Sequence, residues 1–177
     1  MRKLSHLEIV QRQQTKNLSQ NLPFCALLNN IRSLYNVGSI FRTADGVGLQ
    51  KLWLCGITGY PPQSMISKTA LGAEQRMAWE YQKDACSVIQ QLKLKGYQIV
   101  LLEQTEGSLP YEQFVLQSPV CLVVGHEITG VSQDIADLAD IAIEIEMAGL
   151  KNSLNVAVAF GIVAFHIRNT LNVPAVS

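Results

Sequence analysis

The sequence is poor in charge and has no excess of either sign, and these shortages narrow the classes of protein that it can encode. Charged residues make up 16% of its 177 residues and apolar residues 48%, a balance that argues against disorder. The length fits one domain with a sizeable core. Basic and acidic residues number 14 each, so the net charge identifies no partner. Nucleic-acid binders usually have a basic balance, so such a role requires charges that are segregated along the chain.

Metal-ligand and disulfide patterns are also missing. The three histidines are scattered, and no spacing between them is typical of a metal site. They are His6, His126 and His166. None of the four cysteines forms a Cys-x-x-Cys pair, and three lie in apolar runs typical of strands. They are Cys25, Cys55, Cys86 and Cys121. We expect small buried thiols in a cytoplasmic protein without a metal.

Long hydrophobic runs are absent as well. The longest, Val156–Phe165, is too short to cross a bilayer, so no membrane association is expected. Residues 1–20 are too polar for a signal peptide. They carry four basic residues against one acidic residue, Glu8. The basic residues are Arg2, Lys3, Arg12 and Lys16. This segment is either a solvated terminus or an arm that contacts phosphates.

Short apolar runs alternate with helical patterns along the rest of the chain. Strands are expected at Phe24–Leu28, Leu52–Ile57, Tyr97–Leu102, Val120–Val124 and Ile141–Ile145. Helices are expected at Asn36–Asp45, Asp84–Lys95, Asp134–Leu138 and Asn155–Leu171, with Gly46 and Gly48 ending the first, and the structure of Lys68–Ala73 is left open. The alternation predicts an α/β fold, a mostly parallel sheet flanked by helices on both faces. Val120–Val124 is apolar on both faces, as a central parallel strand should be.

Common nucleotide and hydrolase motifs do not fit this chain. Gly46-Val47-Gly48 lacks a third glycine and ends a helix, no Gly-Lys-Ser/Thr loop exists, and there is no Gly-x-Ser-x-Gly elbow. Ligands of parallel sheets bind beyond the carboxyl ends of the strands. Three polar stretches that follow strands are therefore the candidates for a site. They are Asn36–Asp45, Val123–Ser132 and Met147–Val156.

Each stretch also has a purely structural interpretation. Asn36 is a possible N-cap, and Arg42 a solvated or snorkelling side chain. Glu127 alone is more often an exposed loop acid. Ser153 or Asn155 could merely cap the last helix.

Taken together and in this order, the three stretches resemble the motifs of the SPOUT superfamily of methyltransferases, in its TrmH (SpoU) branch of RNA ribose 2′-O-methyltransferases. The first motif is Asn36-Val37-Gly38-Ser39-Ile40-Phe41-Arg42-Thr43-Ala44-Asp45. The second runs from Val123-Val124-Gly125-His126-Glu127 through Gly130-Val131-Ser132, and the third from Met147-Ala148-Gly149 through Ser153-Leu154-Asn155-Val156. The similarity extends from about Phe24 to the last helix. It divides the chain into a basic N-terminal extension, residues 1–22, and a SPOUT methyltransferase domain, residues 23–177.

The resemblance implies a C-terminal deep trefoil knot, S-adenosylmethionine as cofactor and a homodimer with the site near the subunit interface. A dimer contact or core burial would suit the last helix, which is apolar all round, and dimerisation could pool the two basic extensions. The residues implied to surround the cofactor are Glu103, Gln104, Gly125, Ile145, Met147 and Leu154. The residues implied for catalysis are Arg42, with Asn36, Glu127, Ser153 and Asn155 as its supporting set.

Two positions depart from the family pattern. Relatives often have proline where this chain has His126 and Glu146. Arg42 could act as a base or as an orienter of the ribose hydroxyl and phosphate, and free arginine is a poor base. We expect an RNA 2′-O-methyltransferase, for which a short chain favours tRNA over rRNA. The alternatives are a catalytically silent RNA-binding relative and an enzyme acting on a small nucleotide.

Overall fold

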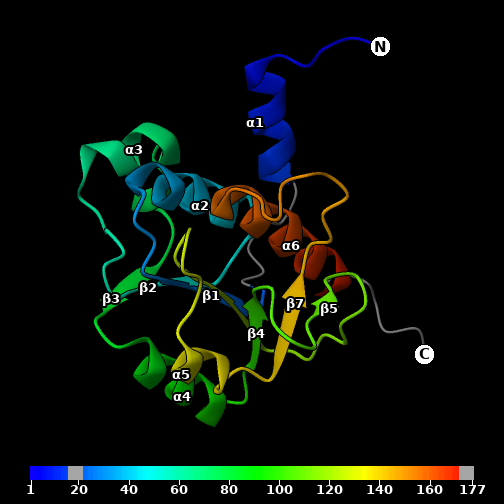
Figure 1. The fold of residues 1–177 in the computed structure, drawn as a ribbon. Coiled ribbons are helices and arrows are strands. Elements are labelled where there is room, and N and C mark those ends of the chain that lie inside the picture. The colour runs from blue at the N-terminus through cyan, green and yellow to red at the C-terminus, as the bar shows by residue number, and fades with distance from the viewer. Residues whose placement is uncertain (16–21, 172–177) are drawn as a thin grey trace.

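A computed structural model describes residues 1–15 and 22–171, in which a seven-stranded sheet lies between two layers of helices (Figure 1). The strands are β1 Phe24–Asn29, β2 Lys51–Cys55, β3 Trp79–Gln82, β4 Gln98–Leu102, β5 Leu109–Pro110, β6 Val120–Val124 and β7 Ile141–Glu144. The helices are α1 His6–Thr15, α2 Leu34–Val47, α3 Ser64–Ala70, a 3₁₀ turn Ala73–Gln75, α4 Ala85–Leu94, α5 Gln133–Ala136 and α6 Val156–Leu171. Lys16, part of the expected basic extension, lies outside these residues.

Every strand pairing within the described residues is parallel, and the strand order is β3-β2-β1-β6-β4-β7-β5. The two middle strands, β1 and β6, are in register from Phe24 opposite Val120 to Leu28 opposite Val124. Both are buried along their whole length. The prediction of a central strand that is apolar on both faces is therefore confirmed for β6.

Helices cover both faces of the sheet, as the alternation predicted. Alternate residues of β1 point to opposite faces. Ala26 and Leu28 pack toward α2, α3 and α6, whereas Cys25 and Leu27 pack toward α4 and α5. Figure 1 shows these two helical layers above and below the sheet.

The cysteines are free thiols, and three of them are buried. Burial, with a smaller contribution from Asp84, raises the pKa of the Cys55 thiol to about 12. This thiol therefore stays protonated and packs as a small apolar group.

Several predicted elements have different ends in the structure. Helix α2 begins after Ser33, whose hydroxyl accepts the N–H of Asn36, so Asn36 is not the N-cap. Gly46 lies inside the helix, and Gly48 ends it with a left-handed φ of 78°. Asp84 caps α4 as predicted, through the N–H of Cys86.

Five elements had not been predicted, among them the 3₁₀ turn Ala73–Gln75. Strand β3 lies at the edge of the sheet and is only half-buried, so it has no apolar run, and β5 is two residues long. Helix α3 has no side-chain cap, so no capping residue in the sequence indicates where it begins. Helix α1 stands away from the body (Figure 1). Arg2, which precedes this helix, pairs with Glu8 at 2.6 Å. No helix among the described residues is long and apolar enough to span a membrane.

Candidate functional site

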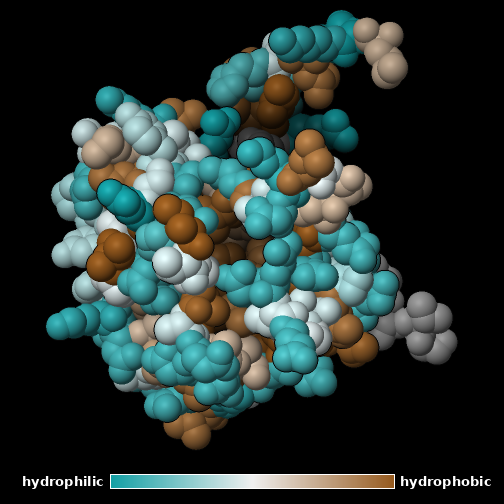
Figure 2. All heavy atoms as spheres, viewed as in Figure 1, coloured by the Kyte–Doolittle hydropathy of each residue, from teal (hydrophilic) through white to brown (hydrophobic). Residues whose placement is uncertain are grey.

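A pocket opens where the carboxyl ends of β4, β6 and β7 meet the start of α6. It contains about 710 Å³ of free space, its open mouth included. Its lining is Leu102, Glu103, Gln104, Val124, Gly125, His126, Glu127, Glu144, Ile145, Met147, Ser153, Leu154, Val156 and Ala159. Figure 2 shows a hollow in the middle of this face with an apolar floor and a mostly hydrophilic rim.

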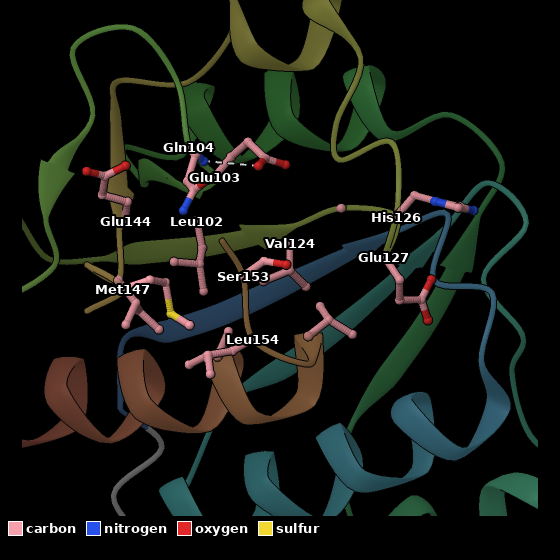
Figure 3. Close-up of a pocket in the computed structure, with 14 residues that line it drawn as sticks. Leu102, Glu103, Gln104, Val124, His126, Glu127, Glu144, Met147, Ser153 and Leu154 are labelled. Atoms are coloured by element: carbon pink, nitrogen blue, oxygen red, sulfur yellow. Dashed lines mark hydrogen bonds between the residues drawn. The ribbon is translucent and has the colours of Figure 1, made fainter. Parts of the chain in front are cut away.

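All six residues that the sequence implied for the cofactor line this one pocket. Glu103 and Gln104 follow β4, Gly125 follows β6, and Ile145 and Met147 follow β7, whereas Leu154 precedes α6. Strands β6, β4 and β7 are neighbours in a parallel sheet, so their carboxyl ends meet at the same edge. Figure 3 shows Met147 and Leu154 across the pocket from Gln104.

Glu127 also lines the pocket and fastens it to α2. Its carboxylate accepts the backbone N–H groups of Arg32 and Ser33, each at 3.0 Å, and the side-chain amide of Asn36 at 3.0 Å. In Figure 3 this side chain is directed toward α2. Partial burial raises the pKa of Glu127, but these hydrogen bonds outweigh burial and hold the pKa below its ordinary value. Glu127 is therefore a charged clamp at the start of α2, where the helix dipole favours an anion.

Asn36 and Asn155 extend this clamp to the third motif. The side-chain N–H of Asn155 donates to Oδ1 of Asn36 at 3.1 Å. Oδ1 of Asn155 accepts the N–H of Ala157 at 2.9 Å and so caps α6. The capping interpretation of Asn155 is thus correct, and the residue also joins α6 to α2. Ser153 lines the pocket and makes no hydrogen bond with the residues that the structure describes.

Arg42 does not reach the pocket of its own chain. It is exposed on the outer side of α2, six residues and roughly 9 Å along the helix from Asn36. Within the described parts of the chain it has no hydrogen-bond or ion-pair partner. Its position leaves the guanidinium available to a group from outside the chain.

The charge of the pocket is negative. Glu103, Glu127 and Glu144 line it, and no lysine or arginine among the described residues does. Gln104 donates to the carbonyl of Asn152 at 2.7 Å, which fixes the loop before α6. Such a pocket suits a ligand that carries positive charge and an apolar part.

Some lining residues had no site assigned to them from the sequence. Leu102, Val124, Val156 and Ala159 form apolar walls and carry no polar signal. Glu144 lies inside the predicted strand Ile141–Ile145 and ends β7 in the structure. Glu146, at the second departure from the family pattern, is exposed and lines a neighbouring hollow with Lys151.

The fold and the pocket define a class: a parallel α/β protein whose ligand site joins three separate polar stretches at the carboxyl edge of its sheet. The chain belongs to the SpoU rRNA Methylase family, whose sequence model matches residues 23–165. The resemblance to the TrmH (SpoU) branch is thereby confirmed.

Individual relatives agree with this family. The chain is 33% identical to the tRNA (guanosine(18)-2'-O)-methyltransferase of Aquifex aeolicus over 141 residues, 77% of this chain and 64% of that protein. The chain thus spans just under two thirds of that relative's length. The crystal structure of the A. aeolicus TrmH/SpoU tRNA modifying enzyme matches with a TM-score of 0.78 and 26% identity, covering 95% of this chain and 90% of that one. The AdoMet-bound rRNA methyltransferase of Sinorhizobium meliloti has a TM-score of 0.79 and 29% identity, covering 84% and 56%.

Proposed function

We propose that this protein is an S-adenosylmethionine-dependent RNA methyltransferase that methylates a ribose 2′-hydroxyl. The observation that carries the proposal is the joining of the three motif stretches at one pocket by Glu127, Asn36 and Asn155. Family membership and the names of the relatives support the same reaction. The AdoMet in the S. meliloti structure supports the choice of cofactor.

The pocket fits that cofactor by its chemistry. S-adenosylmethionine has a flat apolar ring system, a sulfonium and an ammonium group. Leu102, Val124 and Leu154 offer apolar walls for the ring, and the lining carboxylates complement the positive charges. Gly125 allows the turn at Gly130 to lie close against this wall of the pocket, since a Cβ on Gly125 would lie 2.6 Å from the backbone of Gly130. When bound, the cofactor would supply an electrophilic methyl group.

The substrate RNA would bind at the rim of the pocket. A polyanion is repelled by three carboxylates, so its phosphates need cations elsewhere. Arg32, Arg42 and Lys151 are exposed on the segments that surround the pocket or lead from it. Contacts between such side chains and phosphate would position the ribose.

Arg42 would orient the attacking hydroxyl and its adjacent phosphate. Arginine side chains remain protonated in proteins, so its planar fork is suited to holding an anion and ill suited to removing a proton. Aligning two reactants can lower a barrier by several kcal/mol, about 7–11 in favourable systems. Glu127, Asn36 and Asn155 would keep α2 in register with the pocket, and Ser153 would face the substrate.

Methyl transfer to purified RNA fractions tests the proposal. Label from S-adenosylmethionine should enter tRNA in preference to rRNA, since the A. aeolicus relative is named for tRNA. Arg42→Ala should reduce transfer by roughly 100-fold or more, while cofactor binding is unchanged. The matched control is Arg76→Ala, an exposed arginine near the opposite edge of the sheet.

The alternatives make different predictions in that assay. A catalytically silent RNA-binding relative would bind cofactor or RNA without any transfer. An enzyme for small nucleotides would label mononucleotides and leave RNA unlabelled. Either result would overturn the proposal.

We also propose a homodimer in which Arg42 acts on the pocket of the second copy. The support is the distance of Arg42 from its own pocket and an exposed apolar stripe on α6, which packs beside α2. Mixing Arg42→Ala subunits with subunits disabled in the pocket by Leu154→Glu should restore activity, because a mixed dimer holds one intact site. Without restoration, Arg42 does not act across the interface.

The proposal also covers the path of the chain, its division into domains and its location in the cell. The chain after β7 would be threaded into a deep trefoil knot, which agrees with the fold it shares with its relatives. Stretching the unfolded chain by its ends would then give a length shorter than the roughly 3.6 Å per residue of an open chain. Residues 1–22 would be a basic extension of a methyltransferase domain at 23–177, and the protein would act in the cytoplasm.

A further inference from the structure

The turn at residues 126–130 is held together by its own first side chain. The N–H of His126 donates to the carbonyl of Gly130 at 3.1 Å, and the N–H of Gly130 donates to the carbonyl of His126 at 2.9 Å. Within the loop that these two bonds close, Nδ1 of His126 accepts the N–H of Ile128 at 3.0 Å and that of Thr129 at 3.3 Å. The side chain of Ile128 is 83% exposed, so packing does not fix the top of the turn.

The position of this turn decides where Glu127 lies and how the pocket is shaped. Glu127 is its second residue and carries the clamp to Arg32, Ser33 and Asn36. On its other side the turn fits tightly. A Cβ on Gly130 would collide with the carboxylate of Glu103, which lines the pocket. A shift of the turn would therefore move both the clamp and the pocket wall.

The imidazole can hold the turn only when it is neutral. A nitrogen that accepts two N–H groups must carry no proton, so the hydrogen of this ring lies on Nε2. Figure 3 shows the imidazole on the side of the turn away from Leu102 and Met147, while the carboxylate of Glu127 is directed toward α2. Protonation of Nδ1 would set a third N–H against those of Ile128 and Thr129.

We propose that His126 is a positioning residue: its neutral imidazole fixes the turn that delivers Glu127 to α2 and shapes the pocket. Relatives that have proline at this position restrain the backbone covalently. In this chain the imidazole restrains it by accepting two backbone N–H groups, as the side chain of an Asx-turn does. Without that acceptor, the N–H groups of Ile128 and Thr129 lose their partner within the turn. The part of the inference that concerns catalysis rests on the proposed function.

Two variants separate the acceptor from the rest of the side chain. His126→Asn keeps an oxygen that can accept the N–H two residues on, and His126→Ala has no acceptor. NMR measures the protection factors of the Ile128 and Thr129 amides. In the wild type both amides should be protected, His126→Asn should keep the protection, and His126→Ala should lose it roughly tenfold. His6→Asn, on the exposed α1, is the control and should match the wild type.

Binding of S-adenosylmethionine, measured by calorimetry, gives the second readout. His126→Ala should weaken it roughly tenfold and His126→Asn should rescue it. Equal protection and equal binding in His126→Ala would overturn the inference, and so would failure of the Asn rescue. The two readouts need no methyl transfer. A protein that methylates no RNA but shows this pattern would refute the proposed function and leave the role of His126 standing.

Discussion

Glu127 shows how one exposed side chain can organise a site. Its carboxylate accepts hydrogen bonds from three N–H donors, and these bonds hold the start of α2. Because its pKa is lowered, it remains charged at neutral pH. In the proposed reaction Glu127 would therefore act through geometry, and a role as proton acceptor would require it to release those donors.

The stabilisation by Glu127 should depend on pH. Its pKa is lowered in the folded state, so its contribution is present above the ordinary value of 4.5 and is lost as the pH falls through the lower folded value. Glu127→Ala should reduce the free energy of unfolding by about 1–2 kcal/mol at pH 7. Urea unfolding at several pH values should show this difference shrinking below pH 4.5. A difference that stays constant down to pH 3 would contradict the assignment.

At the scale of elements, helix α2 is fastened on two sides by different means. Polar side chains link its first turn to Glu127 and to Asn155 at the start of α6. Its Gly38 lies directly against α3, next to Ile66 and Thr69. Each contact can be removed separately, so each supports its own prediction.

Asn155 has two functions that one substitution should separate. Asn155→Asp retains the oxygen that caps α6 and loses the N–H that donates to Asn36. This variant should keep its melting temperature, because an acid is favourable at a helix N-terminus, while methyl transfer falls about tenfold. Asn155→Ala should lose activity and also about 1 kcal/mol of stability. If both variants melted alike, the capping contact would contribute nothing.

Gly38 should not tolerate even one additional methyl group. A Cβ at this position would overlap the backbone carbonyl of Ile66 and the hydroxyl of Thr69. Gly38→Ala should therefore destabilise the protein by roughly 1–3 kcal/mol in urea unfolding. Gly161→Ala is the matched control, because its nearest neighbour would be Thr43 at 3.7 Å, an ordinary contact. That change should be neutral or stabilising by up to about 1 kcal/mol.

For the molecule as a whole, α6 has two apolar faces with different surroundings. Phe160, Val163 and Ile167 are fully buried against the core. Val158, Ile162 and Phe165 form a second stripe and remain 52%, 36% and 43% exposed. Residues at this spacing share one helix face, and an exposed apolar face of this kind is typical of a protein interface.

Removing that stripe should dissociate the proposed dimer. Ile162→Glu would bury a charge in an apolar contact, which is strongly unfavourable. Sedimentation should find the wild type at twice the chain mass of 19.5 kDa and the variant at the single mass. Leu94→Glu is the control, since Leu94 is 89% exposed on α4 on the opposite face, and it should leave the mass unchanged. A wild-type protein of single mass would refute the dimer.

The sequence by itself determined the parallel sheet and the residues that gather at its carboxyl edge. Val120–Val124 had to be central because it is apolar on both faces. The carboxyl ends of parallel strands lie at the same edge of the sheet, independent of the conformation of the loops. The stretches that begin at Gly125 and Met147 were therefore predicted from their positions after strands, and the family resemblance implied which of their residues surround the cofactor. Strand β3, half-buried at the edge, had no such pattern.

Only the tertiary structure decided how the motif side chains meet. Asn36 and Asn155 are 119 residues apart and Glu127 lies 91 residues from Asn36, so their hydrogen bonds depend on loop geometry that no local pattern encodes. The outward position of Arg42 follows from which faces of α2 the sheet, α3 and α6 already occupy. Helix α6, which is apolar all round from Val156 to Phe165, could equally have been a core helix. Packing against one layer alone left its second face open, because a helix at the surface of a sheet buries only one side.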